Sequence, residues 1–377
     1  MADQQEPAPF AHSMIREIYE QSSTLAATLQ LYVGPDGLLQ ACEPLRNWLR
    51  TAQEEIVIAA SGSSRHAGQV AELFLEDRSG IAVDVEYASE YTYRAEKAMK
   101  SASVLVISQS GETVDTLAAL RKAKQGGHST MAITNVAGSS MAREAEVSFP
   151  TAAGRELAIP ATKSFTAQLL NLYLLSLLAG EVRGTLTAEE LAGLLDRVKA
   201  LPALVQRQLA GWDEAVKRLA PHYGDVKSFL FVGRGVHYPI AREAALKLKE
   251  SSYLHAEGYP AGELKHGPNA LVSDQTPLVL LATRDTTDAG SVERYDKVLQ
   301  LMADMRQQGA RILAVANVGD AEVAALANDV IWVEETQDEL LAISEIIPLQ
   351  FFAYYMAVNN GIDVDHPRNL SKAVLSE

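Results

Sequence analysis

Short apolar runs alternate with stretches of helical periodicity along most of the 377-residue chain. The apolar runs of the first half are EEIVIAA, ASVLVIS, STMAITN and EAEVSFP, and those of the second half are KSFLFVG, TPLVLLA, ARILAVAN and NDVIWVEE. Each half closes with a longer apolar stretch that predicts a buried helix. Such alternation is typical of βαβ units around a parallel sheet. The sequence therefore predicts an α/β protein with two doubly wound, flavodoxin-like domains in tandem.

The two halves are also in register with each other. Asn135 and Asn317 end equivalent predicted strands, and Phe149 and Trp332 lie in the next equivalent pair, with separations of 182 and 183 residues. We read this agreement as an internal repeat. The expected segments are an N-terminal helical arm over 1–50, a first domain over 51–182, a helical connector over 183–224, a second domain over 225–360 and a tail over 361–377.

The charge of the chain limits its partners. The net charge of -15 and the pI near 5.1 give a field that repels polyanions, which argues against nucleic acid and against an anionic membrane surface. The single cysteine, Cys42, excludes an intrachain disulfide and a multi-cysteine metal site. The first residues lack a basic region followed by an apolar stretch, so we expect no secretory signal and a cytoplasmic protein. The apolar stretch at 167–180 is too short to span a bilayer.

One short corner, SQSGET, carries unusual polarity between an apolar run and a helical pattern. Ser108, Gln109, Ser110 and Thr113 follow a predicted strand, where a parallel sheet places ligands and the next helix offers free N–H groups. Gly111 permits a backbone conformation that a side chain would hinder. These residue types are also ordinary turn and cap residues. A second corner, SGSSRHAG, and a third hydroxyl-bearing loop, ATKSF, favour a phosphate pocket.

A nucleotide site has less support. Gly233 and Gly235 follow a predicted strand, but no third glycine follows at the dinucleotide fingerprint spacing, so a tight strand-to-helix turn is the preferred interpretation. The phosphate-binding pattern GxxxxGK[ST] is absent from the sequence.

Candidate acid–base groups lie in the second half. Glu243, Lys247 and Glu250 are spaced i, i+4, i+7 and share one helix face, and on spacing alone a solvated, salt-bridged stripe is the favoured interpretation. His266 stands just before Gly267-Pro268, a rigid turn that could aim an imidazole into a cleft. Lys372 lies near the end of the sequence, where lysines are normally exposed.

Four motifs carry a resemblance to a known family. They are SQSGETVDTLAAL, ATKSF, EAALKLKESSYLHAEGYPAGELKHGP and DHPRNLSK. Taken in this order, they resemble the isomerase half of glutamine-dependent glucosamine-6-phosphate synthase, a tandem pair of sugar isomerase (SIS) domains. The resemblance runs from about residue 10 to the end of the sequence.

The resemblance implies roles for individual residues. Glu250 would move a proton between C1 and C2 of the sugar, and Lys372 would form a Schiff base with the open-chain keto sugar. His266 would open the ring from a neighbouring subunit, which implies a homodimer with shared sites, and Lys247 would add an active-site charge. The residues implied to bind the phosphate are Ser64, Ser108, Gln109, Ser110 and Thr113, and the further sugar-binding residues are Ser61, Gly62, Ser63, Ile159 and Ser371. Neither a metal nor an organic cofactor is implied, because the imine itself is the electron sink.

The main departure from the family concerns the nitrogen source. The synthase carries a glutaminase domain whose nucleophilic cysteine follows the initiator methionine, whereas Ala2 stands there in this sequence. The sequence therefore leads us to expect a glucosamine-6-phosphate deaminase that releases ammonia and fructose 6-phosphate. The alternatives are an ammonia-dependent synthase, supplied or not by a separate glutaminase, a deglycase of a sugar-phosphate conjugate and a non-catalytic sugar-phosphate sensor. Smaller departures stand at Ser61, Ala161 and Ser371 and concern the selectivity for the sugar.

Overall fold

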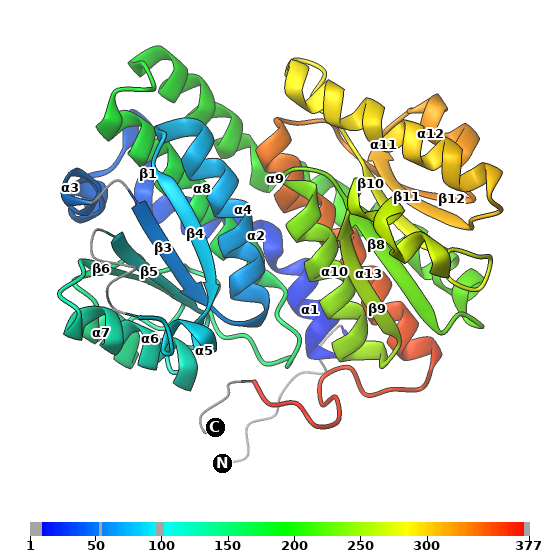
Figure 1. The fold of residues 1–377 in the computed structure, drawn as a ribbon, viewed down its shortest axis with the longest axis horizontal. Coiled ribbons are helices and arrows are strands. Elements are labelled where there is room, and N and C mark those ends of the chain that lie inside the picture. Colours follow the sequence, from blue (N-terminus) through cyan, green and yellow to red (C-terminus); the bar gives the residue numbers. More distant parts are fainter. Residues whose placement is uncertain (1–9, 53–54, 96–101, 373–377) are drawn as a thin grey trace.

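The fold contains two five-stranded parallel sheets that lie side by side (Figure 1). The computed structural model describes residues 10–52, 55–95 and 102–372. The strands of the first sheet are β3 (Glu55–Ala60), β4 (Ala82–Tyr87), β5 (Ala102–Ser108), β6 (Thr130–Thr134) and β7 (Val147–Ser148). Those of the second sheet are β8 (Ser228–Gly233), β9 (His255–Pro260), β10 (Leu278–Ala282), β11 (Ile312–Asn317) and β12 (Asp329–Val333). The two orders, β4-β3-β5-β6-β7 and β9-β8-β10-β11-β12, are equivalent, which confirms two doubly wound domains in tandem.

Helices connect the strands and cover both faces of each sheet. The helices of the first half are α4 (Gly62–Ser79), α5 (Ala88–Tyr91), α6 (Val114–Gln125), α7 (Ser140–Glu144) and α8 (Lys163–Arg183). The second half contains α10 (His237–Ser252), the short 3-10 helices η4 (Glu263–His266) and η5 (Pro268–Leu271), α11 (Ala289–Gln307), α12 (Ala321–Leu326) and α13 (Asp338–Asn359). Helices α4 and α10 pack against each other between the two sheets, so the two domains meet at these helices.

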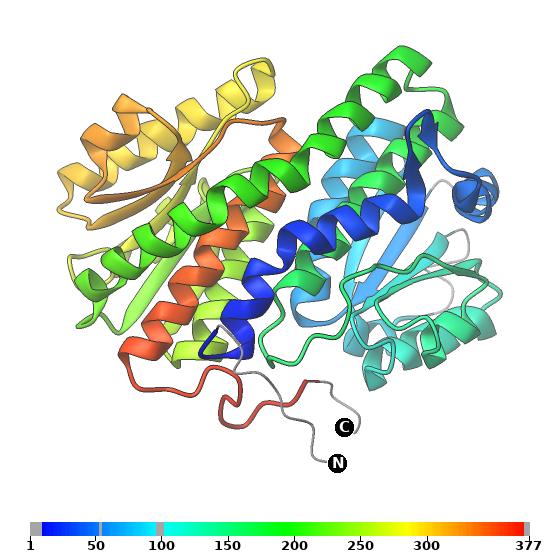
Figure 2. The same cartoon turned by 180° about the vertical axis from the view of Figure 1, so that it is seen from behind.

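The two long apolar helices, α8 and α13, are core helices as the sequence predicts, although α8 (Lys163–Arg183) extends beyond the stretch 167–180 that was judged too short to span a bilayer. Each is long and apolar enough to cross a membrane, but 89% and 94% of their most apolar windows are buried inside the protein. A helix that is apolar on all sides needs protein contacts all round. Helix α9 (Ala188–Leu219) is only partly buried; it begins with a capping box between Thr187 and Glu190 and crosses the back of the molecule in Figure 2.

The N-terminal helices pack into the hydrophobic core. The segment contains α1 (Ser13–Tyr19), α2 (Gln21–Tyr32), the short hairpin β1 (Val33–Gly34) and β2 (Gly37–Leu38), η1 (Gln40–Cys42) and α3 (Glu43–Thr51); a further 3-10 turn, η3 (Ala220–Tyr223), follows α9. Met14, Ile18 and Leu25 are wholly buried, and Gln21 donates from Nε2 to Oε1 of Gln350 on α13 at 2.8 Å. Figure 2 shows α1 and α2 running across the junction of the two halves.

Two details of the predicted repeat are wrong. The apolar runs predict four strands in each half and miss the edge strands β4 and β9, because an edge strand buries few side chains and β9 buries only Ala256. The pairing of Phe149 with Trp332 is shifted by one residue. Met131 pairs with Val147 in the first sheet, and Leu313 pairs with Asp329 in the second, so the equivalent of Phe149 is the buried Ile331. A shift of one residue turns a strand side chain to the other face, and Trp332 is accordingly exposed.

Candidate active site

The candidate site lies at the carboxyl ends of β3 and β5. These are neighbouring strands from which the chain crosses to opposite sides of the sheet, and such a switch point is where open parallel sheets bind ligands. A cavity of about 240 Å³ opens there, a size that suits a small metabolite. Its lining consists of Ser61, Gly62, Ser63, Ser64, Ile107, Ser108, Gln109, Ser110, Thr113, Thr116, Ile159, Ala161, Lys247, Glu250, Leu370, Ser371 and Lys372. Every residue that the resemblance implies for the site, except His266, therefore borders one cavity.

The corner after β5 forms a compact set of hydroxyl groups. The Oγ of Ser108 lies 2.9 Å from Oγ1 of Thr113 and accepts the N–H of Gly111 at 3.2 Å. Gly111 has a φ of +66°, and a Cβ at this position would lie 2.1 Å from Oγ of Ser139. The glycine is therefore required by both backbone conformation and space, as the sequence predicts. Hydroxyl groups and a helix N-terminus at this point suit an anionic group.

The loop ATKSF does not add hydroxyl groups to the cavity, contrary to the sequence prediction. Ala161 lines the cavity, whereas the side chains of Thr162 and Ser164 are buried behind it. The Oγ of Ser164 donates to Oε2 of Glu156 at 2.7 Å. This loop therefore holds the carboxylate of Glu156, a contact that the residue types alone do not predict.

The charged face of α10 is buried rather than solvated. Glu243 and Lys247 are wholly buried, so the predicted salt-bridged surface stripe is wrong on this point. Nζ of Lys247 lies 2.5 Å from Oε2 of Glu250 and 3.4 Å from Oε1 of Glu243. Glu243 extends the network to the first domain, because its Oε2 lies 2.7 Å from Nδ1 of His66 on α4. An ion network thus joins both domains behind the cavity.

Burial and charge act against each other in this network. Burial alone would raise the pKa of Glu243, but the charge of Lys247 and the hydrogen bond with His66 hold that pKa below its ordinary value. Burial would likewise lower the pKa of Lys247, and the carboxylates of Glu250 and Glu243 raise it instead. Lys247 is therefore a fixed ammonium at neutral pH. A permanent positive charge next to Glu250 suits a reaction in which negative charge develops on the substrate.

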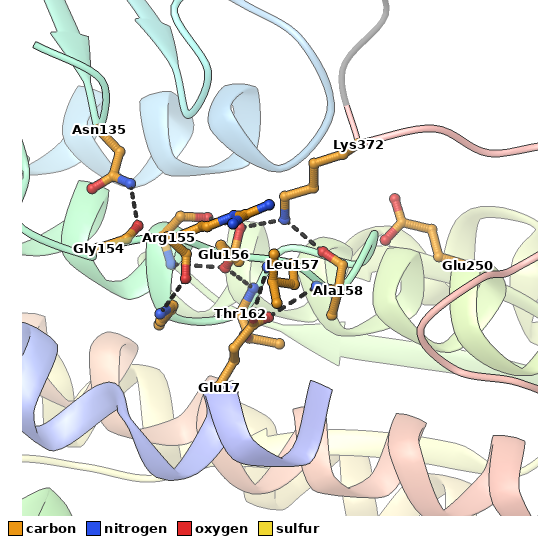
Figure 3. A network of polar contacts seen from close by, with 12 residues as sticks. Glu17, Asn135, Gly154, Arg155, Glu156, Leu157, Ala158, Thr162, Glu250 and Lys372 are labelled. Carbon is orange, nitrogen blue, oxygen red and sulfur yellow. Dashed lines mark hydrogen bonds and ion pairs between the residues drawn. The ribbon is translucent and has the colours of Figure 1, made fainter. Parts of the chain in front are cut away.

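Lys372 reaches the cavity from the tail after α13. Its Nζ donates to Oε2 of Glu156 at 2.5 Å and to the carbonyl oxygen of Ala158 at 2.7 Å (Figure 3). The tail is fixed upstream, since Asp365 accepts the N–H groups of Ser13 and Met14 at 2.6 and 2.9 Å. The tail thus closes over the cavity and places an amine at its edge.

His266 lies outside the cavity. It ends the exposed 3-10 helix η4 that follows β9, and its side chain faces solvent in the single chain. A larger hollow of about 400 Å³ lies beside this loop and is lined by Arg234, Tyr238 and Glu263 among others. This hollow contains neither the hydroxyl corner nor the ion network, so we place the chemistry in the smaller cavity.

Sequence reasoning misses Glu156 and His66 near the site, and it assigns Glu243 to a surface stripe. Glu156 stands in a loop after a weak edge strand, His66 lies in the first turns of α4, and Glu243 has the spacing of a surface charge. Glu243 is buried because α10 packs between the two domains and buries most of its surface. Glu156 and Lys372 are 216 positions apart, and no local pattern predicts such a contact.

A buried carboxylate on α1 supports the loop that carries Glu156. Glu17 accepts the N–H of Leu157 at 2.5 Å and the N–H of Ala158 at 3.3 Å (Figure 3). Burial raises the pKa of Glu17 from 4.5 to about 7, the Leu157 N–H opposes this rise, and the charge of Glu156 adds to it. Lys372, Lys163 and the nearby guanidinium of Arg16 also face this group.

We expect Glu17 to make stability depend on pH. The raised pKa favours the protonated folded state, so its stabilisation is full below pH 4.5 and is lost as pH rises through 7. Relative to Glu17→Gln, the wild-type free energy of unfolding should fall by about 3 kcal/mol between these limits. Urea unfolding of both proteins at pH 5 and pH 8 measures the difference. A difference that is the same at both pH values would contradict the assignment.

Comparison with family models finds two matching segments, residues 49–178 and 223–360, and both match the SIS domain. The chain belongs to the SIS domain family. Each matched segment contains one of the two sheets, so the repeat read from the sequence is a pair of SIS domains. The candidate cavity lies on the first SIS domain and is completed by α10 of the second and by the tail.

Curated relatives match along the whole chain. The chain is 42% identical to glutamine-fructose-6-phosphate aminotransferase (isomerizing) of Pseudomonas putida, over 100% of this chain and 61% of that protein. It is 40% identical to a protein of the same name from Thermus thermophilus, over 99% of this chain and 60% of that protein. The chain thus spans about three fifths of the length of these relatives.

Solved structures place the match in one part of those relatives. The C-terminal domain of glucosamine-fructose-6-phosphate aminotransferase from Francisella tularensis aligns with a TM-score of 0.90 and 34% identity, covering 97% of this chain and 100% of that chain. This confirms the resemblance to the isomerase half. A glucosamine-6-phosphate deaminase from Thermotoga maritima aligns with a TM-score of 0.71 at 23% identity, which is a likeness of fold alone.

Proposed function

We propose that this chain converts fructose 6-phosphate and ammonia to glucosamine 6-phosphate and water. The names of the curated relatives and of the Francisella structure support this amination direction, which the sequence analysis held as an alternative. The deaminase direction, which it placed first, has only a likeness of fold in its favour. The same names include glutamine, so a glutaminase that releases ammonia from glutamine is a fitting nitrogen source. Such phosphorylated sugars are intracellular metabolites, which supports a cytoplasmic location.

One observation carries the proposal. Hydroxyl groups suited to a phosphate, a carboxylate beside a fixed ammonium, and a lysine amine all border the same cavity of about 240 Å³. An aldose–ketose isomerase that acts through an imine needs these three groups within the length of one hexose phosphate.

The groups fit successive steps of the reaction. The corner after β5, with Ser64 and Gln109, would bind the phosphate, and the other lining residues Ser61, Gly62, Ser63, Ile159 and Ser371 would contact the sugar. Lys372 would condense with the C2 carbonyl and release water. Ammonia would then attack C2, and the lysine amine would leave, so that a C2 imine remains.

Glu250 would complete the reaction by moving a proton. Its carboxylate removes a proton from C1 and returns it to C2, while the proton of the C1 hydroxyl passes to the imine nitrogen, which converts the C2 imine to an amine and the C1 alcohol to an aldehyde. The ammonium of Lys247, 2.5 Å from Glu250, would stabilise the negative charge that develops on the C1 oxygen. The net change is the loss of one water molecule for each ammonia consumed.

Ring opening needs a further acid–base group, and we propose that His266 supplies it from a second subunit. His266 is exposed in the single chain and lies outside its own cavity. It stands on a short 3-10 helix next to the glycine with a φ of +138°, a loop that projects from the edge of the second sheet. A homodimer would bring this loop to the partner's cavity.

We expect two inactive variants to restore activity to each other. In a mixed dimer of His266→Ala and Glu250→Gln chains, one site combines the intact Glu250 of one chain with the intact His266 of the other. Random exchange should therefore restore about a quarter of the wild-type activity per site. The assay compares the mixture with each variant alone after subunit exchange has been verified by mass spectrometry. Exchange without recovery would exclude shared sites.

The direction of the reaction is tested with the purified protein. The measurement compares kcat/KM for glucosamine 6-phosphate formation from fructose 6-phosphate at physiological ammonium with kcat/KM for ammonia release from glucosamine 6-phosphate. Faster synthesis supports the proposal. Ammonia release without measurable synthesis would restore the deaminase interpretation, and no reaction in either direction would refute both.

A further inference from the structure

Glu156 is a fully buried carboxylate behind the cavity. It lies in the loop between β7 and α8, its side chain has no exposed surface, and it does not line the cavity itself. Oε1 accepts the N–H groups of Thr162 and Ser164 at 3.0 and 3.1 Å. Oε2 accepts the Ser164 hydroxyl at 2.7 Å and the ammonium of Lys372 at 2.5 Å. Oε1 thus accepts from residues 162 and 164, whereas Oε2 also accepts from Lys372 in the tail.

The position of Lys372 follows from this arrangement. An ammonium has three N–H donors, and two of them are directed to Oε2 of Glu156 and to the carbonyl oxygen of Ala158. Both acceptors lie on the wall side, since Lys372 lines the cavity and Glu156 does not. Within residues 10–52, 55–95 and 102–372 these are the two acceptors of Nζ, so its third donor is available to a substrate. Glu17 fixes the same loop from α1, through the N–H groups of Leu157 and Ala158, and so holds both acceptors in place.

The positive charge on Nζ is conserved during condensation. The ammonium of Lys372 and the C2 carbonyl give a protonated imine and water, so two hydrogens of the ammonium leave with the carbonyl oxygen and one remains on nitrogen. The nitrogen is a cation both before and after the step. A buried carboxylate that pairs with the first cation can pair with the second, whereas a neutral imine would leave it without a charged partner, which costs free energy.

We propose that Glu156 is the counter-ion that positions Lys372 and keeps its Schiff base protonated. This inference rests on the proposed function, because it requires Lys372 to react with the keto sugar. The protonated imine is the form that ammonia attacks and the form that withdraws electrons from C1. Glu156 acts through Lys372 and is therefore a positioning residue.

The test is reductive trapping of the imine. Wild-type protein saturated with fructose 6-phosphate is treated with cyanoborohydride, and the secondary amine on Lys372 is quantified by intact mass and peptide mapping. Glu156→Gln keeps an acceptor for Thr162 and Ser164 but presents an amide to Lys372. Because a charge-assisted hydrogen bond is lost, we expect its trapping rate to fall on the order of tenfold or more. Its dissociation constant for fructose 6-phosphate, measured by calorimetry, should stay close to that of the wild type.

Two further variants separate charge from structure. Ser164→Ala removes a neutral donor from the same carboxylate oxygen and should trap at the wild-type rate, and Glu156→Asp, which keeps the charge, should recover part of the rate. Equal losses in Glu156→Gln, Glu156→Asp and Ser164→Ala would reduce Glu156 to a structural role and overturn the inference. If Glu156→Gln formed the adduct at the wild-type rate, the inference on Glu156 would be overturned while the proposed function would stand. Absence of an adduct on wild-type Lys372 would overturn the proposed function together with it.

Discussion

Glu250→Gln should lower kcat by on the order of 10²-fold or more, since the amide cannot take up a proton from C1. The substitution keeps the size of the side chain and an oxygen that can accept from Lys247. We therefore expect KM for fructose 6-phosphate to change little. Steady-state kinetics with saturating ammonium measure both constants.

A matched substitution elsewhere on the surface provides the control. Glu214 is 71% exposed on α9 and pairs with Arg218 one helical turn away. Glu214→Gln should leave kcat and KM at wild-type values, because an exposed pair contributes little to stability. If Glu250→Gln retained most of the wild-type kcat, another group would have to carry the proton.

The second large effect is expected at the hydroxyl corner. Ser110→Ala combined with Thr113→Ala removes two donors to the phosphate, each of which contributes as a hydrogen bond to a charged group. We expect kcat/KM for fructose 6-phosphate to fall by on the order of 10²-fold through KM. The preference for the phosphorylated sugar over fructose should fall by a similar factor.

The control for the corner is an exposed hydroxyl with no role in the cavity. Ser23 donates to the carbonyl oxygen of Glu20 on the surface, so Ser23→Ala should leave kcat/KM for both sugars unchanged. Equal kcat/KM for fructose and its 6-phosphate in the wild type would remove the phosphate assignment altogether.

The fold could be predicted where burial leaves a periodic pattern. The central strands β3, β5, β8 and β10 are almost wholly buried, so they stand out as apolar runs, and so do α8 and α13. The edge strands β4 and β9 left no such pattern, because each buries a single side chain, whereas the edge strands β7 and β12 were predicted. The one-residue error between Phe149 and Trp332 came from matching aromatic side chains without knowing which face of the sheet each occupies.

The site could be predicted where its residues lie together in a short motif. The hydroxyl corner after β5 is local, and its glycine has the conformation that the sequence suggested. The buried face of α10 could not be separated from a surface stripe by spacing alone, since burial depends on packing against α4 and α13. The partner of Lys372 was beyond prediction, because Glu156 is brought to it only when the tail folds across the first domain.

The central claim is that this cavity moves a proton between C1 and C2 of a phosphorylated sugar. Incubation of the wild-type protein with fructose 6-phosphate in D2O, followed by proton NMR, tests it without ammonia, because the Lys372 imine already withdraws electrons from C1 and so allows Glu250 to exchange its proton. The account predicts that one of the two C1 hydrogens is replaced by deuterium, that Glu250→Gln abolishes this exchange, and that fructose does not exchange. Bound fructose 6-phosphate that keeps both C1 hydrogens after prolonged incubation with the wild-type protein would contradict the account.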